Sequence, residues 1–114
     1  MINLMSGAIK KYFNPGGDKK AELTGEQIVL EYLRNKGFNV ETGDEEFEAK
    51  RDSLNFLFQV KYSLNQKNPN FVSPDEEEKL KLKAANKGYE AWEARVNLDK
   101  KYQPIGEILW RKIF

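Results

Sequence analysis

The sequence predicts a single α/β domain of 114 residues, an α+β arrangement in which a central mixed β-sheet is flanked by helices. One observation is the strongly apolar strand pattern from Asn55 to Ser63. A second is that two helical segments carry their own start and stop signals. The third is the order of elements, α-α-β-β-β-α-β-β, in which a helix separates the third strand from the fourth. We expect an N-terminal helix or arm over residues 1–18 and a core over 19–114, with room for one hydrophobic core but not two.

The N-terminal segment has apolar residues at helical spacing before an N-P-G-G turn at residues 14–17. A basic pair lies on each side of this turn: Lys10 and Lys11 before it, Lys19 and Lys20 after it. Two interpretations stay open for these lysines, a solvated helix end and an arm that contacts phosphates.

A stronger helix is predicted from about Lys20 to Lys36, with Gly37 as its stop. Glu22 and Glu26 are four residues apart and therefore share one face of it. Gly25 lies within this helix, which indicates either a surface where another backbone approaches closely or a helix that begins later, with Thr24 as its cap.

Three strands follow, over residues 38–42, 46–51 and 55–63, and the last two form a hairpin. In the second of them Glu46 and Glu48 point to the same face. A carboxylate from either residue can therefore lie beside the polar residues of the third strand.

The third strand places Gln59 and Lys61 on one face of an otherwise apolar run. A lysine near a core is costly unless a negative charge lies close to it. The alternative is an edge strand whose polar face is solvated.

The rest of the chain predicts a polar loop, a helix and two strands. Ser73 and Pro74 give a clear helix start, with Glu76 three residues after the cap, and Gly88 ends the helix. We expect its lysines (Lys79, Lys81, Lys83 and Lys87) to form a solvated face. The last strands are predicted over residues 89–98 and 105–113, where Trp92, Trp110 and Phe114 are candidates for burial in the core or in a subunit interface.

Composition narrows the possible chemistry. The chain has no cysteine and no histidine, which excludes disulfides, thiolate catalysis, histidine general bases and zinc sites built on these residues. Catalysis would have to use carboxylates, lysine, tyrosine or a hard metal ion held by oxygen ligands. The net charge of +1 gives no global basic field. No membrane-length apolar run and no signal-peptide pattern is visible, so we expect a soluble, cytoplasmic protein.

The ordered motifs resemble the PD-(D/E)XK nuclease superfamily, and most of all the archaeal-type Holliday junction resolvases. The motifs are a helix glutamate (Glu26), a strand entry G-F-N-V at residues 37–40, the segment E-F-E-A at 46–49, and Q-V-K at 59–61. The resemblance covers about residues 19–114 and implies a restriction-endonuclease-like core.

The resemblance also implies a metal-dependent phosphodiesterase with Mg²⁺ as its cofactor and Mn²⁺ as the alternative metal. By position, Glu46 is the first metal ligand, Gln59 occupies the second acidic position, and Val60 offers its carbonyl. Lys61 is then the catalytic lysine, and Glu26 completes the site.

Two residues depart from the family pattern. Gln59 stands where most resolvases have glutamate, so it brings an oxygen ligand without a charge, as in the Q-x-K form of Mrr-like restriction nucleases. Glu46 replaces the commoner aspartate, and Asp44, Glu45 or Glu48 is the ligand if the register differs. Glu22 is the corresponding alternative to Glu26.

The leading hypothesis is a structure-selective DNA endonuclease, a Holliday junction resolvase that acts as a homodimer on four-way junctions. The alternatives are a Q-x-K restriction-type nuclease on duplex DNA, a nuclease-fold protein that only binds nucleic acid or protein, and a small globular domain whose Lys61 is a surface residue. With little net charge, DNA contacts would rest on local basic residues: Lys10, Lys11, Lys19, Lys20, Lys50, Arg51 and Lys67.

Overall fold

The computed structural model describes residues 18–43, 45–65 and 71–114. The predicted N-terminal helix, with Lys10 and Lys11, lies outside the described residues, as do Asp44 and Lys67. The described elements are α2 (Lys19–Asn35), β1 (Asn39–Thr42), β2 (Phe47–Arg51), β3 (Leu54–Leu64), α3 (Pro74–Lys87), β4 (Glu90–Leu98) and β5 (Leu109–Lys112). None of the helices in these ranges has the length and apolar character needed to cross a membrane.

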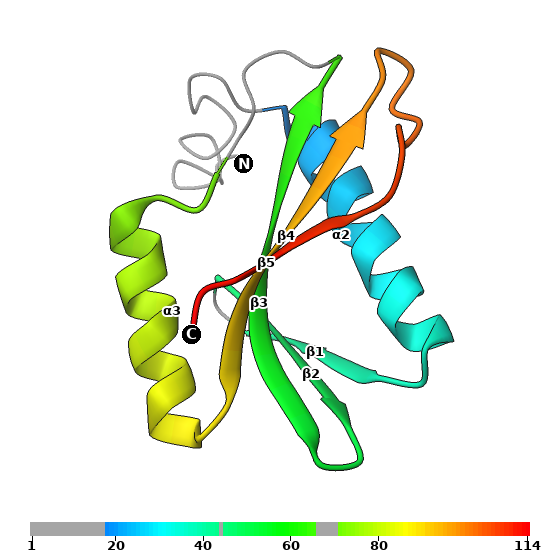
Figure 1. Ribbon diagram of the computed structural model, residues 1–114. Coiled ribbons are helices and arrows are strands. Elements are labelled where there is room, and N and C mark those ends of the chain that lie inside the picture. The colour runs from blue at the N-terminus through cyan, green and yellow to red at the C-terminus, as the bar shows by residue number, and fades with distance from the viewer. Residues whose placement is uncertain (1–17, 44, 66–70) are drawn as a thin grey trace, which may run out of the picture.

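The five strands form one mixed sheet in the order β1-β2-β3-β4-β5. β3 and β4 run parallel and are connected through α3, whereas the other neighbours are antiparallel. α2 and α3 lie on opposite sides of this sheet (Figure 1). The predicted mixed sheet flanked by helices is therefore confirmed, and β3 is its central strand, so the edge-strand alternative for residues 55–63 is wrong.

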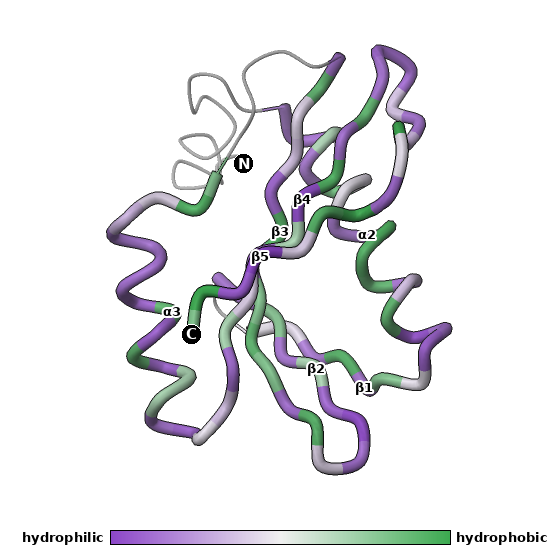
Figure 2. The backbone as a smooth tube through the Cα atoms, in the orientation of Figure 1, coloured by the Kyte–Doolittle hydropathy of each residue, from purple (hydrophilic) through white to green (hydrophobic). Residues whose placement is uncertain are grey.

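Each helix covers its own part of the core. On the α2 side, Phe56, Phe58 and Tyr62 of β3 pack with Val29 and Leu33 of the helix. On the α3 side the apolar cluster is smaller and centres on Leu57, Leu80, Ala84 and Ala91. α3 is mostly hydrophilic along its length (Figure 2), so the polar residues of the sheet on that side have polar neighbours.

The caps of both helices explain their bounds. α2 begins at Asp18, whose side chain accepts a hydrogen bond from the Ala21 N–H. The alternative start at Thr24 is wrong. Gly25 lies against the sheet, where a Cβ would be 3.6 Å from the Tyr62 Cβ, an ordinary van der Waals distance. The helix contacts the sheet at Gly25, but no backbone among the described residues approaches closely enough to require glycine there. α3 has the predicted capping box of Ser73 and ends at Gly88, which has a φ of 73° that favours glycine.

The last strand is shorter than predicted. We expected residues 105–113, but β5 spans only Leu109–Lys112. Gly106, with a φ of 74°, turns the chain away from the extended conformation before β5 begins.

Candidate active site

Two neighbouring rows of polar side chains cross the α3 side of the sheet. Gln59 pairs with Glu93 and Lys61 with Arg95 in the parallel register of β3 and β4. On the other side of β3, Phe47 pairs with Phe58. Glu46 directly precedes this paired segment, and its contact with Lys83 of α3 puts its side chain on the α3 side of the sheet. We call Glu46, Gln59, Lys61, Glu93 and Arg95 the polar face.

Gln59 is a buried amide that has no hydrogen-bond partner among the described residues. Its side chain is only 5% exposed, yet it makes no hydrogen bond to any residue that the structure describes. A buried polar group left unsatisfied costs about 1–3 kcal/mol, so such groups normally have a partner. The amide of Gln59 therefore has hydrogen-bonding capacity that the described residues do not use.

Glu46 turns its carboxylate into the space beside Gly43. A Cβ at Gly43 would lie 2.5 Å from the Glu46 Oε2, so a larger residue at this position would require the Glu46 side chain to move. The Glu46 Oε1 lies 2.9 Å from the Nζ of Lys83 on α3. The alternative ligand Glu48 lies two residues further along the strand, opposite Leu57, and pairs with Lys50 and Lys87. Glu45 is exposed, whereas Glu46 is partly buried.

Lys61 is paired with an acid that the sequence analysis did not select. Its Nζ lies 3.0 Å from the Oε2 of Glu76 in the first turn of α3. The Oε1 of Glu76 accepts the backbone N–H of Ser73, which closes the capping box. Partial burial would raise the pKa of Glu76, but hydrogen bonds from Ser73 and Lys61 outweigh it and hold this pKa below the ordinary value.

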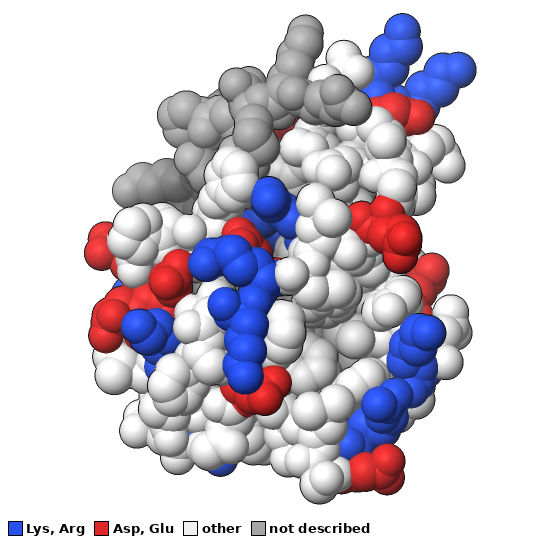
Figure 3. All heavy atoms as spheres, viewed as in Figure 1, with Lys and Arg blue, Asp and Glu red and all other residues white. Residues whose placement is uncertain are grey.

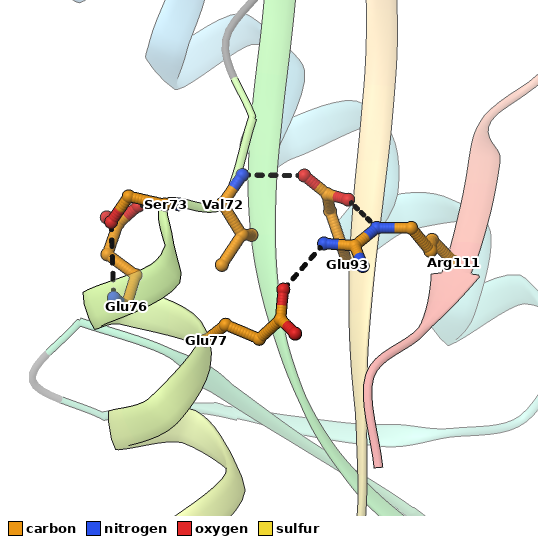
Figure 4. A network of polar contacts seen from close by, with 6 residues as sticks. All are labelled: Val72, Ser73, Glu76, Glu77, Glu93 and Arg111. Atoms are coloured by element: carbon orange, nitrogen blue, oxygen red, sulfur yellow. Dashed lines mark hydrogen bonds and ion pairs between the residues drawn. The ribbon is translucent and has the colours of Figure 1, made fainter.

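Glu93 is a second buried polar residue that sequence reasoning missed. It is 2% exposed, and both of its oxygens have partners (Figure 4). Oε2 accepts the Val72 N–H at 2.7 Å, and Oε1 accepts the Arg111 Nε–H at 2.6 Å. Arg111 also contacts Glu77 of α3 at 3.2 Å. We call this set (Val72, Glu77, Glu93 and Arg111) the clasp, because it joins the entry of α3 to β4 and β5.

Arg95 was also missed, although the sequence contains a signal for it. β4 carries E-A-R at residues 93–95, the same polar-x-basic pattern as Q-V-K at 59–61. The parallel register brings the two patterns side by side. The Arg95 guanidinium lies over the ring of Phe71, with its Cζ 4.3 Å from the ring centroid.

The helix acids lie in another layer. α2 packs on the face of the sheet opposite to Gln59 and Lys61, and Glu22 and Glu26 are partly buried on either side of Gly25. Glu22 is 3.8 Å from Lys19. Val60 directs its side chain toward the α2 core. Its peptide group belongs to the part of β3 beyond Phe58, where the pairing with β2 has ended, so β3 has a strand neighbour only on the β4 side there.

The predicted DNA-contacting residues fall at two ends of α2. Lys19 and Lys20 lie in its first turn, and Lys20 is 4.7 Å from the Tyr102 ring centroid. Lys50 and Arg51 are the last two residues of β2. Arg51 donates a hydrogen bond to the carbonyl of Lys36, at the C-terminal end of α2. A helix of 17 residues is about 25 Å long, so the two pairs form separate patches.

The polar face has the oxygen donors that a hard metal ion takes. Glu46 offers a carboxylate, Gln59 an unpartnered amide oxygen, and Val60 a carbonyl in the next residue, all ligand types found at Mg²⁺ sites. No group of three or more acidic side chains that could hold a metal occurs in the described ranges. A metal site on the polar face would therefore need mixed ligands rather than a cluster of acids.

The fold is similar to that of a known DNA-processing enzyme. No family model and no curated protein matches the sequence. Among solved structures, the chain is similar to Hjc of Archaeoglobus fulgidus, a Holliday junction resolvase from an archaeal hyperthermophile. The TM-score is 0.65 with 20% sequence identity, over 81% of this chain and 72% of that chain. The two proteins share a fold.

Proposed function

We propose that this protein is a metal-dependent DNA endonuclease that acts on branched DNA, as a Holliday junction resolvase does. The observation that carries the proposal is the buried amide of Gln59, which has no hydrogen-bond partner among the described residues and lies two residues from Lys61, on the side of the sheet where Glu46 also lies. The shared fold with a resolvase supports the choice of substrate.

Glu46, Gln59 and the Val60 carbonyl are the residues that would hold Mg²⁺ or Mn²⁺. A bound metal ion polarises the scissile phosphate and lowers the pKa of water. Glu26 lies on α2, on the opposite side of the sheet from these residues, so it is not part of the proposed site.

Lys61 is the proposed catalytic residue. Its ammonium group can orient the attacking water or stabilise negative charge that develops on the phosphate. The contact with Glu76 keeps the side chain on the polar face. Because a four-way junction has two-fold symmetry, a homodimer would present two such sites to it.

The test is cleavage of a labelled four-way junction and of a matched linear duplex, each with Mg²⁺, Mn²⁺ or EDTA. The wild type should make paired nicks in the junction only when metal is present. Lys61→Ala should lower the rate by at least about a hundredfold. Lys79→Ala, an exposed lysine of α3 without a partner among the described residues, is the matched control and should cleave normally.

Other outcomes would replace the proposal. Equal cutting of junction and duplex would indicate a restriction-type nuclease. Metal-independent DNA binding without cleavage would indicate a protein that has lost its chemistry, with Gln59 as the residue that marks the loss.

A further inference from the structure

Lys61 and Arg95 are neighbouring cations that have different kinds of partner. They are directly paired in the register of β3 and β4 and lie on the same face. Lys61 has a carboxylate partner in Glu76 at 3.0 Å. Arg95 contacts no carboxylate among the residues that the structure describes, and its contact is with the ring of Phe71.

This aromatic contact leaves the hydrogen-bonding capacity of Arg95 available. A guanidinium over an aromatic ring is attracted by the ring's π-system and held in orientation. Its N–H donors lie in the plane of the group and are not used by that attraction. Arg95 is partly exposed, so these donors can reach a ligand from solvent.

The aromatic ring that contacts Arg95 is itself largely exposed to solvent. Phe71 is 53% exposed, although phenylalanine is an apolar residue. It directly precedes Val72, whose N–H is held by the buried Glu93. The clasp therefore fixes the backbone next to Phe71 and places the ring beside Arg95.

Negative charge on the two sides of Arg95 is already neutralised. Glu93, on the same strand and face, is paired with Arg111 at 2.6 Å, and Glu76 is paired with Lys61. The surface seen in Figure 3 carries basic side chains near its middle and acidic ones on both sides. An anion at Arg95 would therefore meet a cation that no internal acid has neutralised.

We propose that Arg95, supported by Phe71, binds a backbone phosphate of the DNA next to the phosphate that is cleaved. The inference rests on the proposed function, because it assigns part of the substrate to that site. A planar guanidinium binds phosphate through two parallel hydrogen bonds. Arg95 acts in binding, whereas Lys61 acts in the chemical step.

The test measures DNA binding without cleavage. Fluorescence anisotropy of a labelled four-way junction in EDTA gives Kd at a series of salt concentrations for the wild type, Arg95→Ala, Arg95→Lys and Phe71→Leu. Loss of one phosphate contact should reduce the slope of log K against log salt by about one. We expect this for Arg95→Ala, with affinity weakened about tenfold.

The other variants separate charge from geometry. Arg95→Lys should keep the salt slope but bind more weakly than the wild type, because lysine lacks the planar fork. Phe71→Leu should weaken binding by a few fold with the slope retained. The matched control is Arg34→Ala, which removes an exposed arginine from α2 on the opposite side of the sheet and should change neither quantity.

The outcomes distinguish this inference from the proposed function. A wild-type affinity and salt slope in Arg95→Ala, in protein that still cleaves junctions, would overturn the role of Arg95 alone. The expected change of slope in protein that never cleaves would support Arg95 and overturn the nuclease proposal. No binding of DNA by the wild type would overturn both.

Discussion

Gln59 is the residue on which the chemistry of the polar face depends. Its amide oxygen can be a metal ligand, but it adds no negative charge, and Glu46 is an acid on the same side of the sheet. A second acid there, Glu93, has both oxygens in use. Of the two acids, Glu46 and Glu93, only Glu46 is therefore left as a carboxylate ligand for a metal ion. Glu46 is itself in contact with Lys83.

Replacing Gln59 by glutamate should strengthen metal binding. The substitution keeps the shape of the side chain and adds a carboxylate next to Glu46, and Mg²⁺ and Mn²⁺ affinity rises with ligand charge. We expect Mn²⁺ to bind Gln59→Glu about tenfold more tightly than the wild type, as measured by isothermal titration calorimetry. Without metal the new buried carboxylate should lower the melting temperature. An unchanged Mn²⁺ affinity would argue that Gln59 is not a metal ligand.

At the level of elements, α3 supplies the partners of two charges on the polar face. Glu76 contacts Lys61, and Lys83, seven residues later, contacts Glu46. Seven residues are close to two helical turns, so both side chains project toward the sheet. The helix start and stop were predictable because capping is local in sequence. These contacts were not, because they depend on how α3 is seated on the sheet.

Lys83 should compete with a metal ion for Glu46. Because the lysine is 42% exposed, the ion pair is worth at most about 1 kcal/mol. Lys83→Met should therefore tighten Mn²⁺ binding by up to about fivefold, measured by the same titration. Lys79→Met, which removes an equal charge from the same helix, is the matched control. Equal effects of both variants would show that general charge, rather than the contact with Glu46, is responsible.

For the molecule as a whole, the sheet and its two covering helices followed from the sequence, whereas part of the polar face did not. The apolar run at residues 55–63 predicted a strand but left a central and an edge position open, and strand alternation put Gln59 and Lys61 on one face. Glu93 and Arg95 join them only through the parallel pairing of β3 with β4. The register of this parallel pair depends on how the connecting helix α3 packs on the sheet. No short sequence pattern specifies it.

The clasp connects three segments that are distant in the sequence. Its loss should therefore lower the free energy of unfolding of the whole domain. Arg111→Met keeps the aliphatic stem but leaves the carboxylate of Glu93 buried without its cation, which should cost about 2 kcal/mol in the free energy of unfolding. Urea denaturation measures this loss, and faster hydrogen exchange of the Val72 amide would locate it at the entry of α3. The control is Lys112→Met on the same strand. Its partner Glu90 is 42% exposed, so the cost should stay below about 1 kcal/mol. If both variants lose equal stability, burial of Glu93 does not set the strength of the clasp, and the position of Phe71 beside Arg95 must have another cause.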